Sequence, residues 1–199
     1  TQHILIKKLS KKNETKKRKI NFYEYFIPEQ KIFQVLAFIQ TENRGQSAAR
    51  NTGLEVASGN YIIFLDGDDW IEKDTIELCL KAIQEYDTDL VMFNASAFAD
   101  GMSEGEVRKF DYTRSSSVTN TKFGTRELFS SFISNVDYLV SPCLYMYKFD
   151  TFRELRFQPG IIYEDNLFTT RLLIDKNDAT ATAFPYYPGK QSAQIQGSM

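Results

Sequence analysis

The sequence contains little histidine or cysteine and no long apolar run. Its only histidine is His3, which argues against a histidine-based zinc site and against a Ser-His-Asp triad. Two cysteines, Cys79 and Cys143, are too few for a disulfide scaffold, so we expect reduced thiols. No run of about 18 apolar residues is present, which argues against a transmembrane helix. The length of 199 residues is sufficient for one globular domain with a core of its own.

Positive charge is concentrated near the start of the chain. Residues 1–40 hold nine Lys or Arg against three Glu, although the whole chain has a formal net charge of −2. A basic segment on an acidic body predicts attraction to an anionic surface, so we expect a cytoplasmic protein with peripheral contact to the inner face of the membrane. A solvated, lysine-rich loop is the simpler alternative. The nearby aromatic residues follow the basic run as a block, which argues against nucleic-acid binding.

The first half of the chain shows the alternation of strand and helix that is typical of an α/β fold. Residues 32–39 and 61–65 are apolar runs that predict buried strands. Between them, Ala49, Gly53, Val56 and Ala57 form one stripe of a helix that Ser47 is positioned to cap. This arrangement predicts a βαβ unit with parallel strands and a right-handed crossover.

In the rest of the chain, strand and helix signals alternate less regularly. Periodicity indicates helices around residues 76–83 and 128–133 and a third that begins at Glu164. Residues 89–94 and 143–147 read as strands, and the polar, serine-rich residues 99–121 read as a loop. We therefore expect an α/β half followed by a mixed half.

Three carboxylates, Asp66, Asp68 and Asp69, directly follow the strand at 61–65. Ligands of open α/β sheets bind at the carboxyl ends of the strands, and clustered negative charge there is stabilised by a cation. Oxygen ligands favour Mg²⁺ or Mn²⁺ bridging to substrate phosphates. The structural alternative is that Asp68 or Asp69 caps a helix beginning near Ile71.

Two other classes of protein have an acidic loop of similar sequence. A calcium-binding EF-hand is excluded because Trp70 and Ile71 stand where a ligand and a glycine are required. A phosphatase of the haloacid dehalogenase type also has Asp-x-Asp after a strand, and it stays an alternative although Trp70 departs from its pattern.

Two further segments hold residues suited to a substrate site. Residues 43–51 open the first helix, whose N-terminus favours anions, and Arg50 adds a guanidinium that suits phosphate. Arg50 is equally suited to a structural ion pair with the acidic cluster. Glu164 and Asp165 open the last helix, where either carboxylate can serve as a general base or simply complement the helix dipole.

These three segments together resemble the family 2 glycosyltransferases of bacterial surface polysaccharide and lipooligosaccharide synthesis. The residues that carry the resemblance are Asn43–Asn51 (NRGQSAARN), Gly59–Asp69 (GNYIIFLDGDD) and Tyr163–Phe168 (YEDNLF), in the family's order. The resemblance implies a GT-A fold, an α/β architecture whose mixed, mostly parallel central sheet is flanked by helices. It also implies metal-dependent transfer of a sugar, with inversion, from a nucleotide-sugar donor, UDP-linked by family habit, to a saccharide or lipid-linked saccharide.

The resemblance also assigns roles residue by residue. Asp165 with Glu164 would be the base, Asp68 and Asp66 would bind Mn²⁺ or Mg²⁺, and the nucleotide-sugar would contact Arg50, Asp66, Asn43 and Gly45. We expect one GT-A domain over residues 1–199, with a basic segment at 1–30, a nucleotide-sugar and metal half at 31–95 and an acceptor half at 96–199.

One family feature is missing from the sequence. The family's opening strand, helix and second strand, which ends in a loop that holds the nucleotide base, have no counterpart in these residues. This departure predicts an N-terminally truncated chain, which would be inactive alone if so. It also leaves open a catalytically inactive module that keeps the fold and binds a partner.

Overall fold

The computed structural model describes residues 19–27, 32–40, 42–67, 69–98, 111–114, 121–135, 137–183 and 193–196. Its central sheet has five strands: β3 (Tyr61–Ile63), β9 (Tyr145–Lys148), β5 (Leu90–Met92), β10 (Thr180–Ala183) and β8 (Phe123–Gly124), in that spatial order. The prediction of a mixed sheet is confirmed. The prediction that it is mostly parallel is wrong for these strands, because only β5 and β10 pair in parallel. Strand β9 comes late in the chain and runs antiparallel between β3 and β5. Strand β8 is likewise antiparallel to its neighbour β10.

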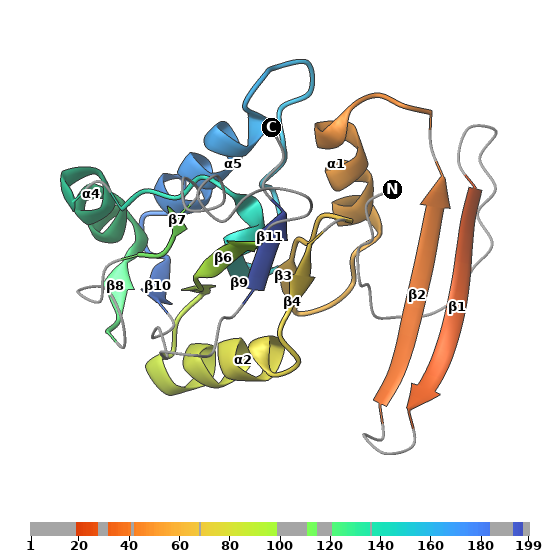
Figure 1. The fold of residues 1–199 in the computed structure, drawn as a ribbon, viewed down its shortest axis with the longest axis horizontal. Helices are drawn as coiled ribbons and strands as arrows, with labels where there is room; N and C mark the ends of the chain where they lie inside the picture. Colours follow the sequence, from red (N-terminus) through yellow and green to blue (C-terminus); the bar gives the residue numbers. More distant parts are fainter. Residues whose placement is uncertain are drawn as a thin grey trace.

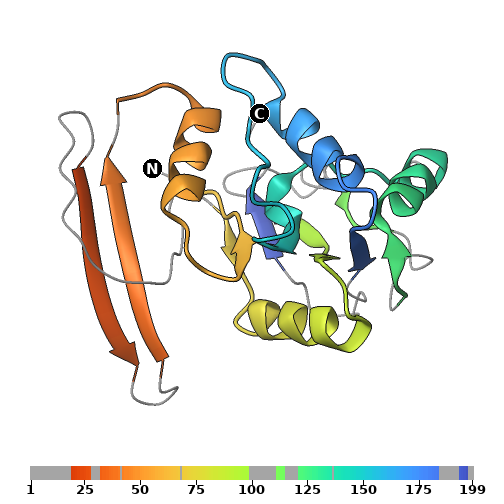
Figure 2. The same ribbon diagram turned by 180° about the vertical axis from the view of Figure 1, so that it is seen from behind.

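Helices cover the central sheet on two sides (Figures 1 and 2). Helix α2 (Thr75–Tyr86) lies on one side, and α4 (Thr125–Asn135) and α5 (Glu164–Ile174) lie on the other. These elements confirm the three helices that periodicity predicts at 76–83, 128–133 and from Glu164. The predicted strand at 143–147 begins as the 3-10 turn η2 (Pro142–Leu144) and becomes β9 only at Tyr145. Among the described residues, no helix is both long and apolar enough to cross a bilayer.

A second sheet joins segments from distant parts of the chain. Its order is β4 (Trp70–Ile71), β11 (Ala193–Gln196), β6 (Ala95–Phe98) and β7 (Asp111–Tyr112). Strand β11 pairs antiparallel with β4 and parallel with β6. This sheet therefore fixes the chain just beyond the acidic turn that follows β3. Of the predicted loop at 99–121, residues 111–114 and Thr121 are described, and 111–112 form β7.

The predicted βαβ unit is wrong. Strands β1 (Lys19–Ile27) and β2 (Ile32–Gln40) form an antiparallel hairpin in which Lys19 faces Gln40 and Ile27 faces Ile32. This hairpin stands at one end of the molecule beyond α1 (Gln46–Val56), while β3 pairs with β9 instead (Figures 1 and 2). A hairpin closes a short loop, so its entropic cost is lower than that of a distant parallel pair. Residues 1–18 lie outside the described residues.

Aromatic packing connects the end of β3 with the start of α5. Phe64, one residue beyond β3, meets Phe157 and Phe168 edge to face, with ring centroids 5.3 and 5.7 Å away. The rings of Phe157 and Phe168 are stacked at 3.8 Å and are 4° from parallel. All three side chains are buried. Geometries of this kind add about 1 kcal/mol per pair beyond area burial, so they hold the two chain segments in a fixed relation.

Candidate active site

The acidic turn after β3 does not cap a helix. The amide of Asp69 donates to the carbonyl of Asp66 at 3.2 Å, and strand β4 begins at the next residue. Helix α2 begins only at Thr75, with Asp74 as its N-cap residue. The alternative that Asp68 or Asp69 caps a helix near Ile71 is therefore wrong, because no helix begins there. Asp68 itself lies outside the described residues.

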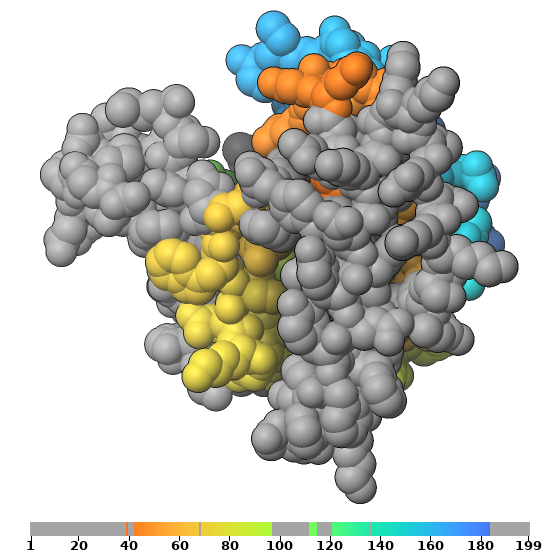
Figure 3. Space-filling view, turned by 90° about the vertical axis from the view of Figure 1, so that its right-hand side faces the viewer, coloured from red at the N-terminus to blue at the C-terminus, as the bar shows by residue number. Residues whose placement is uncertain are grey.

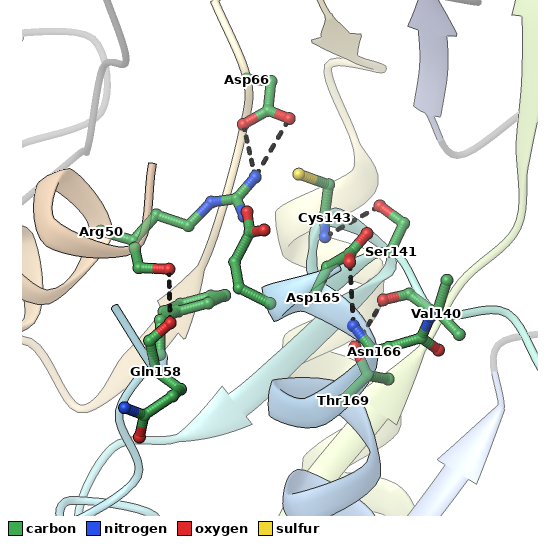
Figure 4. A network of polar contacts seen from close by, with 12 residues as sticks. Arg50, Asp66, Val140, Ser141, Cys143, Gln158, Asp165, Asn166 and Thr169 are labelled. Carbon is green, nitrogen blue, oxygen red and sulfur yellow. Dashed lines mark hydrogen bonds and ion pairs between the residues drawn. The ribbon is translucent and has the colours of Figure 1, made fainter. Parts of the chain in front are cut away.

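Arg50 links the acidic turn to the start of α5. Its Nη2 lies 3.1 and 3.3 Å from the two carboxylate oxygens of Asp66, and its Nη1 lies 3.4 Å from Oε1 of Glu164 (Figure 4). The guanidinium carbon lies 5.0 Å from the ring centroid of Phe157. Arg50 is only 3% exposed, and its buried Nε has no hydrogen-bond partner in the part of the chain that the structure describes. The structural ion pair proposed for Arg50 is thus present, and it joins two motifs that lie 114 residues apart.

Helix α1 also holds the segment that leads to α5. Ser47 Oγ donates to the carbonyl of Gln158 at 3.0 Å. The side-chain amide of Asn51 donates to the carbonyl of Phe157 at 2.8 Å and accepts from its backbone amide at 2.9 Å. Figure 3 shows the start of α1 in orange beside this segment in light blue. Ser47 and Asn51 of α1 therefore hold the segment that precedes the third motif, and Arg50 holds Glu164 within that motif.

The turn before α1 differs from its prediction. Gly45, and not Ser47, is the N-cap residue, with φ of 82° and no side-chain cap. This positive φ is readily adopted only by glycine. Oδ1 of Asn43 accepts from the amide of Gly45 at 3.1 Å, and both residues are exposed. The first turn of α1 holds no acidic residue, so its N-terminal amides are not complemented by a carboxylate of the same turn.

Glu164 and Asp165 begin α5, where the helix dipole stabilises ionised carboxylates. Their surroundings differ. Glu164 is paired with Arg50, whereas Oδ1 of Asp165 accepts the backbone amide of Asn166 at 2.9 Å. In Figure 4, Asp66 lies above the other labelled residues, and Cys143 lies between it and Asp165. The structure therefore brings Asp66 and the two carboxylates of α5 into one neighbourhood.

Asp66, Asp69 and Cys143 form a group suited to a metal ion. One ligand atom from each of these residues lies within 4.8 Å of the other two. Burial, with a smaller contribution from Asp66, raises the pKa of Cys143 to about 12, so the thiol is neutral at neutral pH. The charged ligands are then carboxylate oxygens, which fits Mg²⁺ or Mn²⁺ better than a soft metal. Asp69 and Cys143 were not assigned to the metal from sequence.

A second buried arginine, Arg114, was not recognised from sequence. It is 3% exposed and donates from Nη1 to the carbonyl of Phe93 at 2.9 Å. Its guanidinium carbon lies 5.0 and 5.6 Å from the ring centroids of Tyr145 and Phe132. Nε and Nη2 are buried and have no hydrogen-bond partner among the described residues. Arg114 lies in a segment that the sequence predicts as a polar loop. Its charge among small polar residues is the one local signal that could have indicated it.

A family model and similar proteins point to the same protein family. The sequence model of the family described as "Glycosyl transferase family 2" matches residues 23–155, which is more than half of the chain. Two similar proteins come from Streptococcus pneumoniae. Glycosyltransferase GlyA is 35% identical over 70% of this chain and 20% of its own length, and glycosyltransferase GlyG is 28% identical over 64% and 42%. The chain thus spans well under half of these relatives.

The fold comparison agrees with the sequence comparison. The crystal structure of Staphylococcus aureus TarS 1–349 in complex with UDP-GlcNAc matches with a TM-score of 0.58 and 21% sequence identity. The match covers 80% of this chain and 41% of that chain. A structure of TarS 1–349 in complex with UDP matches with a TM-score of 0.56 and 22% identity. At this level of identity the likeness concerns the fold, which is the GT-A fold.

Proposed function

Because the chain belongs to glycosyltransferase family 2, we propose that it transfers a sugar from a nucleotide-sugar donor to a saccharide or lipid-linked saccharide acceptor. The observation that carries this proposal is the bridge from Asp66 through Arg50 to Glu164. It joins the acidic turn after β3 to the helix that offers a base. Family membership replaces the phosphatase alternative, whereas an inactive binding module is an outcome of the experiment below.

The donor would lie over the carboxyl end of β3. Asp66 would accept hydrogen bonds from the ribose hydroxyls, and Arg50 would hold Asp66 in place from a buried position. The N-terminal amides of α1, after Asn43 and Gly45, lack a carboxylate in the first turn and favour an anionic group of the donor. UDP is the nucleotide that we propose, supported by the TarS complexes with UDP and UDP-GlcNAc.

The residues of the acidic turn fit a divalent ion. Asp66 and Asp69 offer oxygens close enough to share one ligand sphere, and Asp68 is proposed as a further ligand from sequence alone. A bound Mn²⁺ or Mg²⁺ would stabilise the charge that develops on the departing diphosphate. Two hydrogen bonds from Arg50 orient the Asp66 carboxylate from the other side.

Asp165 is the general base of this proposal. It would take the proton of the acceptor hydroxyl as that oxygen bonds to the anomeric carbon. At the same time the bond between the anomeric carbon and the diphosphate oxygen breaks, and the nucleoside diphosphate leaves. One displacement of this kind inverts the anomeric centre. Glu164 is a positioning residue in this proposal, because its carboxylate already forms an ion pair with Arg50.

The proposal is tested by hydrolysis of nucleotide-sugars. The protein is incubated with UDP-, GDP- and dTDP-linked sugars and Mn²⁺, and release of the nucleoside diphosphate is measured. We expect at least one donor to be hydrolysed, and Asp165→Asn to lower the rate by about a hundredfold or more. The matched control is Asp175→Asn at the other end of α5, which should leave the rate unchanged.

Two results would contradict the proposal. Absence of hydrolysis with every donor, together with no stabilisation by UDP and Mn²⁺, would indicate the inactive binding module. Equal rates in the wild type and in Asp165→Asn would remove Asp165 from the reaction.

A further inference from the structure

The segment that leads into α5 exposes an unusual amount of apolar surface. Six large apolar side chains are exposed among the described residues, and four of them lie within residues 161–167. These four are Ile161, Ile162, Tyr163 and Leu167, of which Ile162 and Tyr163 are 82% and 72% exposed. Water contact at so many large apolar side chains is unfavourable, and an exposed cluster of this kind commonly marks a binding surface.

The backbone of Tyr163 is held in a conformation that tyrosine rarely adopts. Its φ and ψ are 62° and 44°, in the left-handed region, which costs an L-residue about 1 kcal/mol or more. The chain on both sides keeps it there. Phe157 and Gln158 are fixed to α1, and the carbonyl of Tyr163 accepts the amide of Asn166 at 3.1 Å. A strained, exposed aromatic residue that its surroundings over-determine points to a functional position.

The polar neighbours of this surface restrict what can bind there. Glu164 and Asp165 follow Tyr163 directly and are complemented by the dipole of α5. An anionic lipid headgroup would be repelled by Asp165, whereas Glu164 is already paired with Arg50. A sugar ring fits better, because one face of a pyranose consists of C–H groups while its rim carries hydroxyls that can donate to Asp165. The combination of apolar surface and adjacent carboxylates therefore favours a carbohydrate.

We propose that Tyr163, with Ile162 beside it, is a platform on which a sugar ring of the acceptor packs. The platform rests on the proposed function and adds to it the acceptor side of the same site. Since Tyr163 is the N-cap residue of the helix whose first turn holds Asp165, the proposed platform adjoins the proposed base. Tyr163 is then a specificity-determining residue that acts on acceptor binding and not on donor binding.

The test compares two variants of Tyr163 on an array of immobilised mono- and oligosaccharides, in the presence of UDP and Mn²⁺. Tyr163→Asn removes the ring, and asparagine tolerates the left-handed backbone, so the turn is preserved. Tyr163→Phe keeps the ring. We expect the wild type to bind at least one glycan and Tyr163→Asn to bind it about tenfold more weakly, as loss of an aromatic contact predicts. Tyr163→Phe should bind within about threefold of the wild type.

Two controls separate a platform from a structural role. Ile133→Ala truncates another exposed apolar side chain, on α4, and should leave glycan binding unchanged. The rise in Tm caused by UDP and Mn²⁺ should be the same in Tyr163→Asn as in the wild type, because donor binding does not use the ring. A smaller rise in that variant would indicate damage to the site as a whole and would overturn the platform.

Four further results would overturn the proposed sugar platform at Tyr163. Glycan binding by Tyr163→Asn equal to that of the wild type overturns the platform, as does a wild type that hydrolyses a donor but binds no glycan. Retention of the wild type on phosphatidylglycerol vesicles that is lost in Tyr163→Asn would assign the surface to lipid and overturn it too. If neither hydrolysis nor stabilisation by UDP is found, the proposed function fails and the platform fails with it.

Discussion

Two buried arginines differ in how their charge is compensated. Arg50 and Arg114 are each 3% exposed, and each guanidinium lies about 5 Å from an aromatic ring centroid. Arg50 forms ion pairs with Asp66 and Glu164. Arg114 forms no ion pair with any residue that the structure describes, and it donates to the carbonyl of Phe93 beside the ring of Tyr145. The same side chain thus has carboxylate partners in one region and a backbone carbonyl and aromatic rings in the other.

The two arginines therefore stabilise their surroundings in different ways. Removing one partner from a buried ion pair leaves the other charge uncompensated, whereas removing an unpaired buried charge relieves a desolvation penalty. The region of Arg50 therefore depends on its arginine for the position of two carboxylates. The region of Arg114 depends mainly on packing against Tyr145 and Phe132.

The largest effect is expected from Arg50→Met. Asp66 and Glu164 would keep their half-buried positions and lose their cation, so we expect the free energy of unfolding to fall by about 3–5 kcal/mol, measured by urea denaturation. The matched control is Lys81→Met, which breaks an exposed, solvent-screened pair with Glu77 on α2 and should leave the free energy of unfolding nearly unchanged. A loss under about 1 kcal/mol for Arg50→Met would show that the bridge is not a stabilising feature.

An intermediate effect is expected at a third charged residue, Asp89, which is hydrogen-bonded at the start of β5, the middle strand of the central sheet. Its carboxylate accepts from Lys148, from the hydroxyls of Thr151 and Thr180, and from the amide of Thr180, at 3.1 to 3.3 Å. Asp89→Asn should therefore lower the free energy of unfolding by about 2 kcal/mol at pH 7.

The effect of Asp89 should also depend on pH. Burial alone would raise the pKa of Asp89, but the hydrogen bonds from Thr180, Lys148 and Thr151 outweigh it and hold the pKa below its usual value. A carboxylate with a lowered pKa stabilises the fold above its unfolded value of about 3.9, and this stabilisation disappears as pH falls through the folded pKa. The difference between wild type and Asp89→Asn should thus narrow below about pH 4. A constant difference between pH 7 and pH 3 would contradict this reading.

The smallest effect is expected from Arg114→Met, although this arginine is as buried as Arg50. Methionine keeps much of the packing against the two rings and removes the buried charge, while the hydrogen bond to Phe93 is lost. We expect the free energy of unfolding to change by less than about 1 kcal/mol. A loss of 3 kcal/mol or more in the same urea experiment would show that the two arginines are equivalent.

The helices and the segments that form the candidate site were largely predictable, because their signals are local. The apolar stripes of α2, α4 and α5 lie within single segments, so periodicity identifies them. Asp66, Arg50 and Glu164 were recognised because each stands in a short motif at the end of a strand or the start of a helix. Their direct contact was foreseen in part, as the ion pair between Arg50 and the acidic cluster.

Strand order and the remaining site residues were not predictable from local signals. Nothing in β9 indicates that it enters between β3 and β5, since that pairing depends on contacts far along the chain. Cys143 approaches Asp66 and Asp69 only because η2 precedes β9. The hydrogen bonds of Ser47 and Asn51 to residues 157 and 158 likewise appear only when α1 and that segment are folded together.

The central claim is that the acidic turn held by Arg50 binds a nucleoside diphosphate together with a divalent ion. It is tested most directly by the Tm of the wild type and of Asp66→Asn, each with UDP and Mn²⁺ added separately and together. At a hundred times the dissociation constant, we predict a rise of about 5 °C in the wild type with both ligands, and no such rise in Asp66→Asn. A rise of equal size in both proteins, or none in the wild type, would contradict the claim.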